Sequence, residues 1–231
     1  MAEIIRIDEN SWRIEDGFVR CFVLAGREKA LLIDTGMTLP NARELAESVT
    51  ELPLELLNTH ADPDHISGNQ AFGRMLMHPA EEENYRFHGG AGEISPINDG
   101  TLIELGGRQL EVIHIPGHTA GSIALLDPKA RVLISGDSVQ TDNIFMFGPR
   151  RNIGAFIESM ERLEGMKDRF DQIWPSHGTF PAGPELIAKL IEGARSIVSG
   201  RAEGTVTEHR GSKVMLYRFP YAGFICDMRL E

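Results

Sequence analysis

The stretch His60-Ala61-Asp62-Pro63-Asp64-His65 decides how this sequence is interpreted, because it places four metal-capable side chains within six residues. Pro63 limits the conformational freedom of the stretch. Residues 54–57 just before it form an apolar run, which predicts a buried strand. The cluster is therefore expected in a loop just past a strand end, where open α/β sheets commonly place their ligands.

Three more predicted strands end in a metal-capable residue beside a glycine. Residues 110–115, 132–134 and 173–175 lead into Pro116-Gly117-His118, Gly136-Asp137 and Ser176-His177-Gly178. Imidazole and carboxylate together suit zinc, iron or manganese, and no nearby cysteine favours a site dominated by thiolates. The stretch from Asp62 to His65 alone is equally typical of a polar surface turn. The metal-site hypothesis therefore depends on the four strand ends as a set.

Composition limits the classes of function. The 231 residues are 42% hydrophobic and 25% charged, which is ordinary for a globular protein that can bury a core without a metal or disulfide. The net charge of 23 − 34 = −11 argues against nucleic acid or anionic membranes as partners. Residues 1–4 show no signal-peptide pattern and no apolar run reaches membrane-spanning length, so a cytoplasmic protein is expected.

Cys21 and Cys226 are expected to be buried reduced thiols, with a mutual disulfide as the minority alternative.

The order of elements predicts one α/β domain. Apolar residues recur at helical spacing over residues 42–52, 153–163 and 186–197, and Asn152 is a plausible cap for the second of these helices. The tail from 205 to 228 is expected to add strand, as a hairpin broken near Pro220. No internal repeat or linker is evident. Residues 1–231 are therefore predicted to be a single domain, with 201–231 as a C-terminal strand or hairpin extension.

Taken together, these motifs resemble the metallo-β-lactamase-fold hydrolase superfamily. The resemblance covers most of the chain and comprises Asp34-Thr35-Gly36, the His60–His65 loop, Pro116 to Ser122, Ser135-Gly136-Asp137 and Ser176-His177-Gly178. It implies an α/β (α+β) fold, a four-layer αββα sandwich in which two mixed sheets pack face to face with helices outside. It also implies a site at one edge of that sandwich.

The resemblance further implies a two-metal site. The first metal ion would be held by His60, Asp62 and His118, the second by Asp64, His65 and His177, and Asp137 would bridge both. A hydroxide between the metals would be the nucleophile, because coordination lowers the pKa of water towards neutrality. Asp64 is the expected catalytic residue, orienting this hydroxide and relaying its proton to the leaving group.

Asp62 departs from the usual loop of the superfamily, His-x-His-x-Asp-His, which has a histidine at this place. The carboxylate adds a negative charge and a harder oxygen ligand, which shifts the preference from zinc towards iron or manganese. It also resembles the di-iron flavoprotein branch, which has a glutamate there. If aspartate is too short to reach, a single-metal site results. The prediction is two divalent transition metal ions, zinc by family resemblance, with iron or manganese open because of Asp62.

The leading functional hypothesis is a metal-dependent hydrolase for a small ester, thioester, lactone or amide. Residues 116–122 are similar to the thioester-cleaving glyoxalase II branch, although the tail does not resemble the helical extension of that branch. The alternative is a non-haem di-iron oxidoreductase acting on oxygen or nitric oxide with a separate electron donor. A small-molecule substrate is expected, without nucleic acid or membrane as partner, and a homodimer is left open.

Residues 140–151 are expected to form one wall of the site. Phe145-Met146-Phe147 could line an apolar substrate pocket or pack into the core. Arg150 and Arg151 could meet an anionic substrate, although surface arginines before a helix are commoner. His78 and His88 are interpreted as solvated loop histidines.

Overall fold

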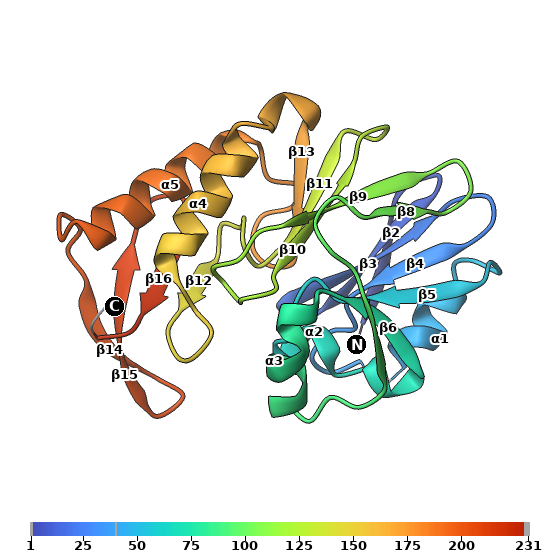
Figure 1. The fold of residues 1–231 in the computed structure, drawn as a ribbon, viewed down its shortest axis with the longest axis horizontal. Helices are drawn as coiled ribbons and strands as arrows, with labels where there is room; N and C mark the ends of the chain where they lie inside the picture. Colours follow the sequence, from blue (N-terminus) through green and yellow to red (C-terminus); the bar gives the residue numbers. More distant parts are fainter. Residues whose placement is uncertain (1, 40, 229–231) are drawn as a thin grey trace.

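The computed structural model describes residues 2–39 and 41–228, whose strands form three sheets (Figure 1). The first sheet contains, in spatial order, β1 (Glu3–Asp8), β2 (Ser11–Asp16), β3 (Val19–Ala25), β4 (Ala30–Ile33), β5 (Leu54–Leu57), β6 (Arg74–Met77) and β7 (Glu93–Pro96). The second has the order β13 (Gln172–Pro175), β11 (Val132–Gly136), β10 (Ile123–Asp127), β9 (Gln109–His114) and β8 (Leu102–Glu104). The helices are α1 (Ala42–Glu47), α2 (Pro63–Ile66), α3 (Glu82–Phe87), α4 (Ile153–Glu164) and α5 (Glu185–Val198).

These two sheets pack face to face, and helices cover their outer faces. Successive side chains of a strand point to opposite faces, so β3 contributes Phe22 and Leu24 to the core between the sheets and Val23 to the core under α1 and α3. Strands β10 and β11 divide in the same way between the central core and the core under α4 and α5. The predicted αββα sandwich is confirmed, because near-continuous apolar strands have both faces buried.

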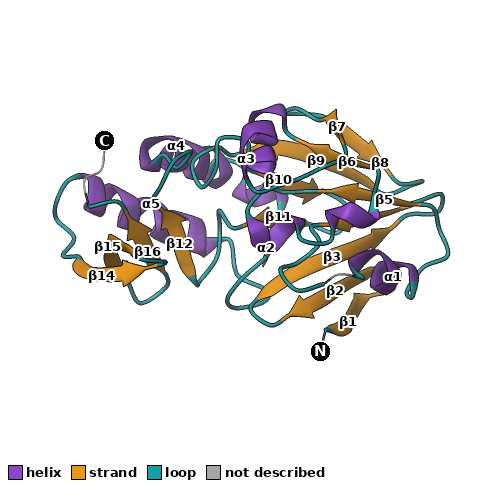
Figure 2. Ribbon diagram, turned by 90° about the horizontal axis from the view of Figure 1, so that it is seen from below, coloured by secondary structure: helices purple, strands orange, loops and turns teal. Residues whose placement is uncertain are grey.

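A third sheet extends the sandwich at one end, beside α4 and α5 (Figure 2). It has the order β12 (Asn143–Met146), β16 (Gly223–Cys226), β15 (Ser212–Arg218) and β14 (Thr205–His209). Strands β15 and β16 form an antiparallel hairpin with Pro220 in its turn, as predicted, and β14 pairs with the other edge of β15 in a second hairpin. The chain continues past Pro220 into β16, which pairs with β12 in parallel register. Residues 229–231 of the predicted extension lie outside the described residues.

The strand directions explain why one edge of the sandwich carries the polar residues. Strands β4 and β5 are parallel, so their carboxyl ends meet at the same edge of the first sheet. In the second sheet β11 runs parallel to β13 and antiparallel to β10, which is antiparallel to β9. Strands β9, β11 and β13 therefore also end at a common edge. Each is followed at once by one of the predicted ligand motifs.

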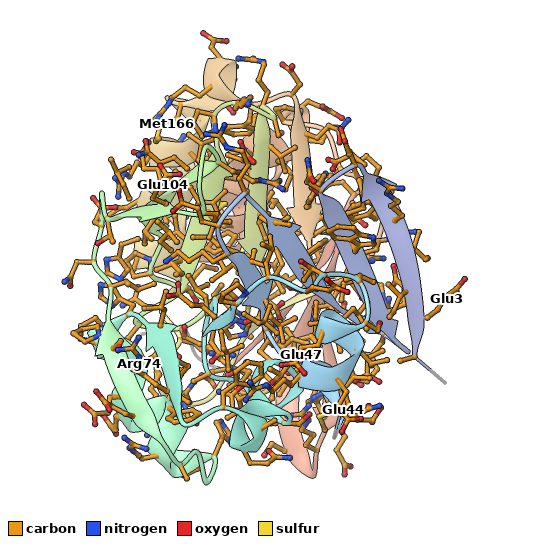
Figure 3. The ribbon with its side chains drawn as sticks, turned by 90° about the vertical axis from the view of Figure 1, so that its right-hand side faces the viewer. Glu3, Glu44, Glu47, Arg74, Glu104 and Met166 are labelled. Carbon is orange, nitrogen blue, oxygen red and sulfur yellow. The ribbon has the colours of Figure 1, made fainter. Side chains whose placement is uncertain are left out.

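The outer surface is charged, and Figure 3 shows Glu3 and Glu44 projecting at the rim of the molecule. Cys21 and Cys226 are free and buried, as predicted. No helix within residues 2–39 and 41–228 combines the length and the apolar character needed to cross a bilayer.

Candidate metal centre

The seven predicted ligand residues converge at the common edge of the two sheets. Their ligand atoms form two groups, and within each group all atoms lie within 4.8 Å of one another. One group consists of His60, Asp62 and His118, and the other of Asp64, His65, Asp137 and His177. All except Asp64 are buried. Loops that follow β5, β9, β11 and β13 supply them.

The geometry of the first loop follows from its sequence. Asp62 precedes a proline and adopts the extended conformation, with φ −71° and ψ 152°. His60 and Asp62 stand two residues apart in the segment that leads from β5 to α2. Pro63 then begins the short helix α2, a position where its missing N–H costs nothing. The chain turns there, and Asp64 and His65 are carried towards the second group.

Asp137 lies between the two groups, with one carboxylate oxygen towards each. Its Oδ1 lies 3.2 Å from Nε2 of His65 and 3.2 Å from Nε2 of His177. Its Oδ2 lies 3.7 Å from Nε2 of His118 and 3.9 Å from Nε2 of His60. A carboxylate in this position can contact two cations at once.

Each of the four histidines is oriented by a partner of its Nδ1 atom. In His118 and His177 this nitrogen donates to the backbone carbonyls of Phe145 and Phe18, at 3.1 and 2.8 Å. In His65 it donates to Asp34 Oδ2 at 2.8 Å. His60 Nδ1 lies 3.1 Å from Oγ1 of Thr59, whose hydroxyl donates to Asp34. In the neutral form, each of the four imidazoles would therefore present the lone pair of its Nε2 atom to the site, which is how protein metal centres hold imidazole ligands.

The polar atoms that face the centre fit a pair of cations. Nε2 of His60 and Nε2 of His118 lie 3.2 Å apart, although each offers a lone pair to the other. Nε2 of His65 and Oδ1 of Asp137 are buried without a hydrogen-bond partner among the described residues. Buried polar groups left unpaired cost about 1–3 kcal/mol each. Metal ions in both groups would satisfy all of these atoms.

The charged groups of the cluster shift one another's pKa values. Burial disfavours the charged form of Asp137, but the nearby imidazoles of His177 and His65 hold its pKa well below the usual range. Burial likewise opposes protonation of His65, yet Asp137 and Asp34 raise its pKa well above the usual value. Burial and the neighbouring His65 lower the pKa of His60. Such mutual dependence is typical of ligands packed for a shared cation.

Two buried carboxylates hold the ligand loops in place. Asp34 accepts from the backbone and hydroxyl of Thr59 as well as from His65. Glu81, fully buried, accepts from the backbone N–H of Ala61 at 2.9 Å and from that of Gly121 at 2.7 Å. It thereby ties the first ligand loop to the loop of His118. The sequence analysis included Asp34 in one of the motifs of the superfamily, whereas it did not predict a role for Glu81.

Gly117 lets the His118 loop approach helix α4. Its φ is +142°, and a Cβ atom there would lie 2.4 Å from Cα of Phe156. Asn152 caps α4 as predicted, with its side chain accepting from the N–H of Ala155 at 2.8 Å. The backbone N–H of Asn152 also donates to the carbonyl of Gly117. The start of α4 therefore fixes the turn that carries His118.

Arg151 contacts the unusual ligand position. Its guanidinium lies 2.5 Å from Oδ2 of Asp62 and also donates to the carbonyl of His118 at 2.6 Å. Burial opposes the charged form of Asp62, but His118 and Arg151 hold its pKa well below the usual range. The sequence did not predict this contact, because it showed Arg151 only as one of two arginines before a helix.

A cavity of about 270 Å³ opens above the cluster. It is lined by Asp62, Pro63, Asp64, Asn84, Phe87, His88, Asp137, Phe145, Phe147, Gly148, Pro149, Arg150, Arg151, Arg210 and Ser212. Residues 140–151 thus form one wall, as expected, with Phe145 and Phe147 in the lining and Met146 in the core. A larger cavity of about 550 Å³ lies at the opposite end of the strands, near Ala25 and Asp127, away from the ligand cluster.

The two loop histidines differ from each other. His88 is exposed, as expected, although it also lines the cavity. His78 is half-buried instead, because its ring stacks on that of His114 with centroids 3.9 Å apart. Burial and His114 lower the pKa of His78 to about 4.

A family model described as the metallo-beta-lactamase superfamily matches residues 14–180. The chain belongs to this superfamily. A protein of Homo sapiens named acyl-coenzyme A thioesterase MBLAC2 is 30% identical, over 73% of this chain and 76% of its own length. A hydroxyacylglutathione hydrolase of Nostoc punctiforme is 26% identical, over 94% of this chain and 80% of its own length.

Solved structures of metallo-β-lactamases share the fold. One from Pontibacter korlensis has a TM-score of 0.73 at 20% identity and covers 84% of this chain and 99% of its own. The DIM-1 metallo-β-lactamase has a TM-score of 0.70 at 16% identity. The superfamily and the His/Asp cluster together confirm the prediction of a metal-dependent hydrolase at the level of the family. The di-iron oxidoreductase alternative is not favoured, because the relatives are named as hydrolases.

Proposed function

We propose that this chain hydrolyses small activated acyl compounds, thioesters first among them, with a binuclear metal centre. The observation that carries the proposal is the convergence of four oriented imidazoles and three carboxylates at one edge of the sandwich, where the three carboxylates line a cavity and where Nε2 of His65 and Oδ1 of Asp137 are buried without a hydrogen bond. The names of two relatives, an acyl-coenzyme A thioesterase and a hydroxyacylglutathione hydrolase, favour a thioester over an amide or lactone.

In this proposal the two groups keep the roles expected from the sequence. His60, Asp62 and His118 would hold one metal ion, Asp64, His65 and His177 would hold the other, and Asp137, which lies between the two groups, would serve both. When bound, the metals lower the pKa of water and polarise the carbonyl of the substrate. The cavity borders Asp62, Asp64 and Asp137, so the substrate carbonyl would reach the centre from that direction.

Asp64 is the proposed catalytic carboxylate. Its side chain is 17% exposed, against 12% for Asp62 and 4% for Asp137, so it is the carboxylate of the centre that solvent reaches most easily. Its Oδ2 lies 3.4 Å from Nε2 of His177. From here Asp64 can orient the attacking water and pass its proton to the departing thiolate.

The metal and the assembly are proposals of the same kind. Zinc is the first choice, and iron or manganese gains from the oxygen ligand of Asp62. Four further statements stay predictions from the sequence. The chain is predicted to be a single cytoplasmic domain without nucleic acid as a partner, and formation of a homodimer is left open.

The test measures both the metal content of the purified protein and its turnover of thioesters. Protein purified without added metal is expected to contain about two transition metal ions per chain by elemental analysis, and to release thiol from S-butyryl-coenzyme A or S-butyrylglutathione. His118→Ala and Asp137→Ala are each expected to lower kcat/KM by about 10³-fold or more, with unchanged circular dichroism, because the apolar cores do not include these residues.

Arg218→Asn, on an exposed residue remote from the cavity, serves as the control that retains activity. Absence of stoichiometric transition metal, even after reconstitution, would contradict the proposal. So would full activity in Asp137→Ala.

A further inference from the structure

The cavity above the metal centre is completed by a segment outside the matched family region. The family model ends at residue 180, whereas the cavity lining includes Arg210 and Ser212. These residues lie at the tip of the β14–β15 hairpin, at the same end of the molecule as α2 and α3 (Figure 1). The hairpin supplies no member of either ligand group. Its contribution to the cavity therefore concerns the substrate and not the metal.

The hairpin tip is anchored beside the cavity by aromatic contacts. The ring of His209 lies 5.1 Å from that of Phe145 and 5.3 Å from that of Phe147, centroid to centroid. Both phenylalanines belong to the cavity wall. This packing places the next residue, Arg210, at the mouth of the site.

The turn itself is unusual in its sequence. His209 pairs with Ser212, so Arg210 and Gly211 form a two-residue hairpin loop. Both have positive φ, 49° and 78°, which is the conformation that favours asparagine or glycine at each position. Arg150, which also lines the cavity, has a positive φ as well, of 73°. Strained backbone at non-glycine residues concentrates at functional sites.

The charges around the cavity favour an anion. Asp62, Asp64 and Asp137 are the proposed ligands, so metal ions would neutralise them. Arg151 is paired with Asp62. Arg150 has only the exposed carboxylate of Glu83, at 2.8 Å, and lies over the ring of Phe87. In the part of the chain that the structure describes, the guanidinium of Arg210 has no hydrogen bond or ion pair. A chain with a net charge of −11 thus surrounds its cavity with arginines.

We propose that Arg210, together with Arg150 of the same cavity lining, binds an anionic group, phosphate or carboxylate, on the part of the substrate that does not react. The cleft then selects anionic thioesters over neutral ones that carry the same acyl group. The inference rests on the proposed hydrolytic function, and it assigns the choice of substrate to the C-terminal hairpin.

The test compares three thioesters of one acyl group. S-butyryl-coenzyme A carries phosphates, S-butyrylglutathione carries carboxylates, and S-butyryl-N-acetylcysteamine is neutral. The variant is Arg210→Asn, because asparagine suits the turn and keeps the hairpin folded. We expect its ratio of kcat/KM for the preferred anionic thioester over that for the neutral one to fall about tenfold, mainly through KM, since one charge-assisted contact is lost. The anionic thioester whose ratio falls identifies phosphate or carboxylate.

Arg218→Asn is the matched control, because Arg218 ends β15 on the same sheet, is exposed and does not line the cavity. A ratio in Arg210→Asn that stays within twofold of the control overturns the inference. If the metal-loaded enzyme cleaves none of the three thioesters, the proposed function fails. Binding of two uncleavable thioethers, S-ethyl-coenzyme A with its phosphates and S-ethylglutathione with its carboxylates, is then measured by calorimetry and decides the inference separately. Equal affinity of Arg210→Asn and of the control for both thioethers refutes the inference, whereas binding at least fivefold weaker for either one supports it.

Discussion

Asp62 and Arg151 act as a charge-balanced pair at the residue scale. The superfamily pattern has a neutral imidazole at the position of Asp62, and an aspartate adds one negative charge. The guanidinium of Arg151, 2.5 Å from the carboxylate, restores the total charge to that of the usual pattern. The departure from the pattern therefore changes the chemistry of the ligand atom more than the net charge of the site.

Replacing this ligand tests that view. In Asp62→His the oxygen ligand becomes a nitrogen, and we expect the ratio of bound zinc to bound iron to rise about threefold or more, because imidazole is the softer ligand. Elemental analysis of protein grown with equal supplies of both metals measures the ratio. Arg151→Gln removes the charge partner while it keeps the oxygen ligand, so its ratio is expected to change less. An equal ratio in Asp62→His and the natural chain would be the contrary result.

The ligands could be predicted from the sequence because each follows a strand end and together they match a spaced pattern. Glu81 could not, although it holds two ligand loops together. It stands in the run Glu81-Glu82-Glu83, which resembles any solvated helix start. Its burial comes from contacts with Ala61 and Gly121, which are distant in the sequence.

At the element scale, helix α4 links the stability of the fold to the position of His118. We expect Asn152→Ala to lower the free energy of unfolding by about 1 kcal/mol, because the N–H of Ala155 loses its cap. For a chain of this size the midpoint of thermal unfolding should fall by about 2–4 °C. Asn152→Asp retains a capping oxygen and is expected to stay within about 1 °C of the natural chain. Equal losses in both variants would show that the cap is not the cause.

Strand β11, which begins with the continuous apolar run Val132-Leu133-Ile134, was predictable from local pattern alone. Strand β12 was not, because its apolar residues Ile144, Phe145 and Met146 are equally compatible with a cavity wall or with packing into the core. Its pairing with β16 joins segments far apart in the chain, and local periodicity carries no information about such partners.

At the scale of the whole molecule, three apolar cores support a site made of charged groups. The cores exclude the ligand side chains, so the fold is expected to persist without metal, but at lower stability. Metals that bind only the folded state, at a free concentration near 100 times their dissociation constant, contribute about 2.7 kcal/mol.

Chelation should therefore lower the midpoint of thermal unfolding by about 5–10 °C in a chain of this length. Differential scanning calorimetry with and without a chelator measures the shift. Asp137→Ala, which lacks the bridging carboxylate, should show a much smaller response. A midpoint that does not move in the natural chain would mean that metal binding is not coupled to folding.

Phe18 connects the turn between β2 and β3 to the candidate ligand His177. Its carbonyl fixes Nδ1 of His177, and its ring, 59% exposed, stacks on the same imidazole with centroids 5.8 Å apart. One residue of the turn between β2 and β3 is thus exposed to solvent and at the same time orients a candidate metal ligand. Because the carbonyl and the ring belong to one residue, the position of the His177 imidazole depends on the first sheet, although His177 itself follows β13 of the second sheet.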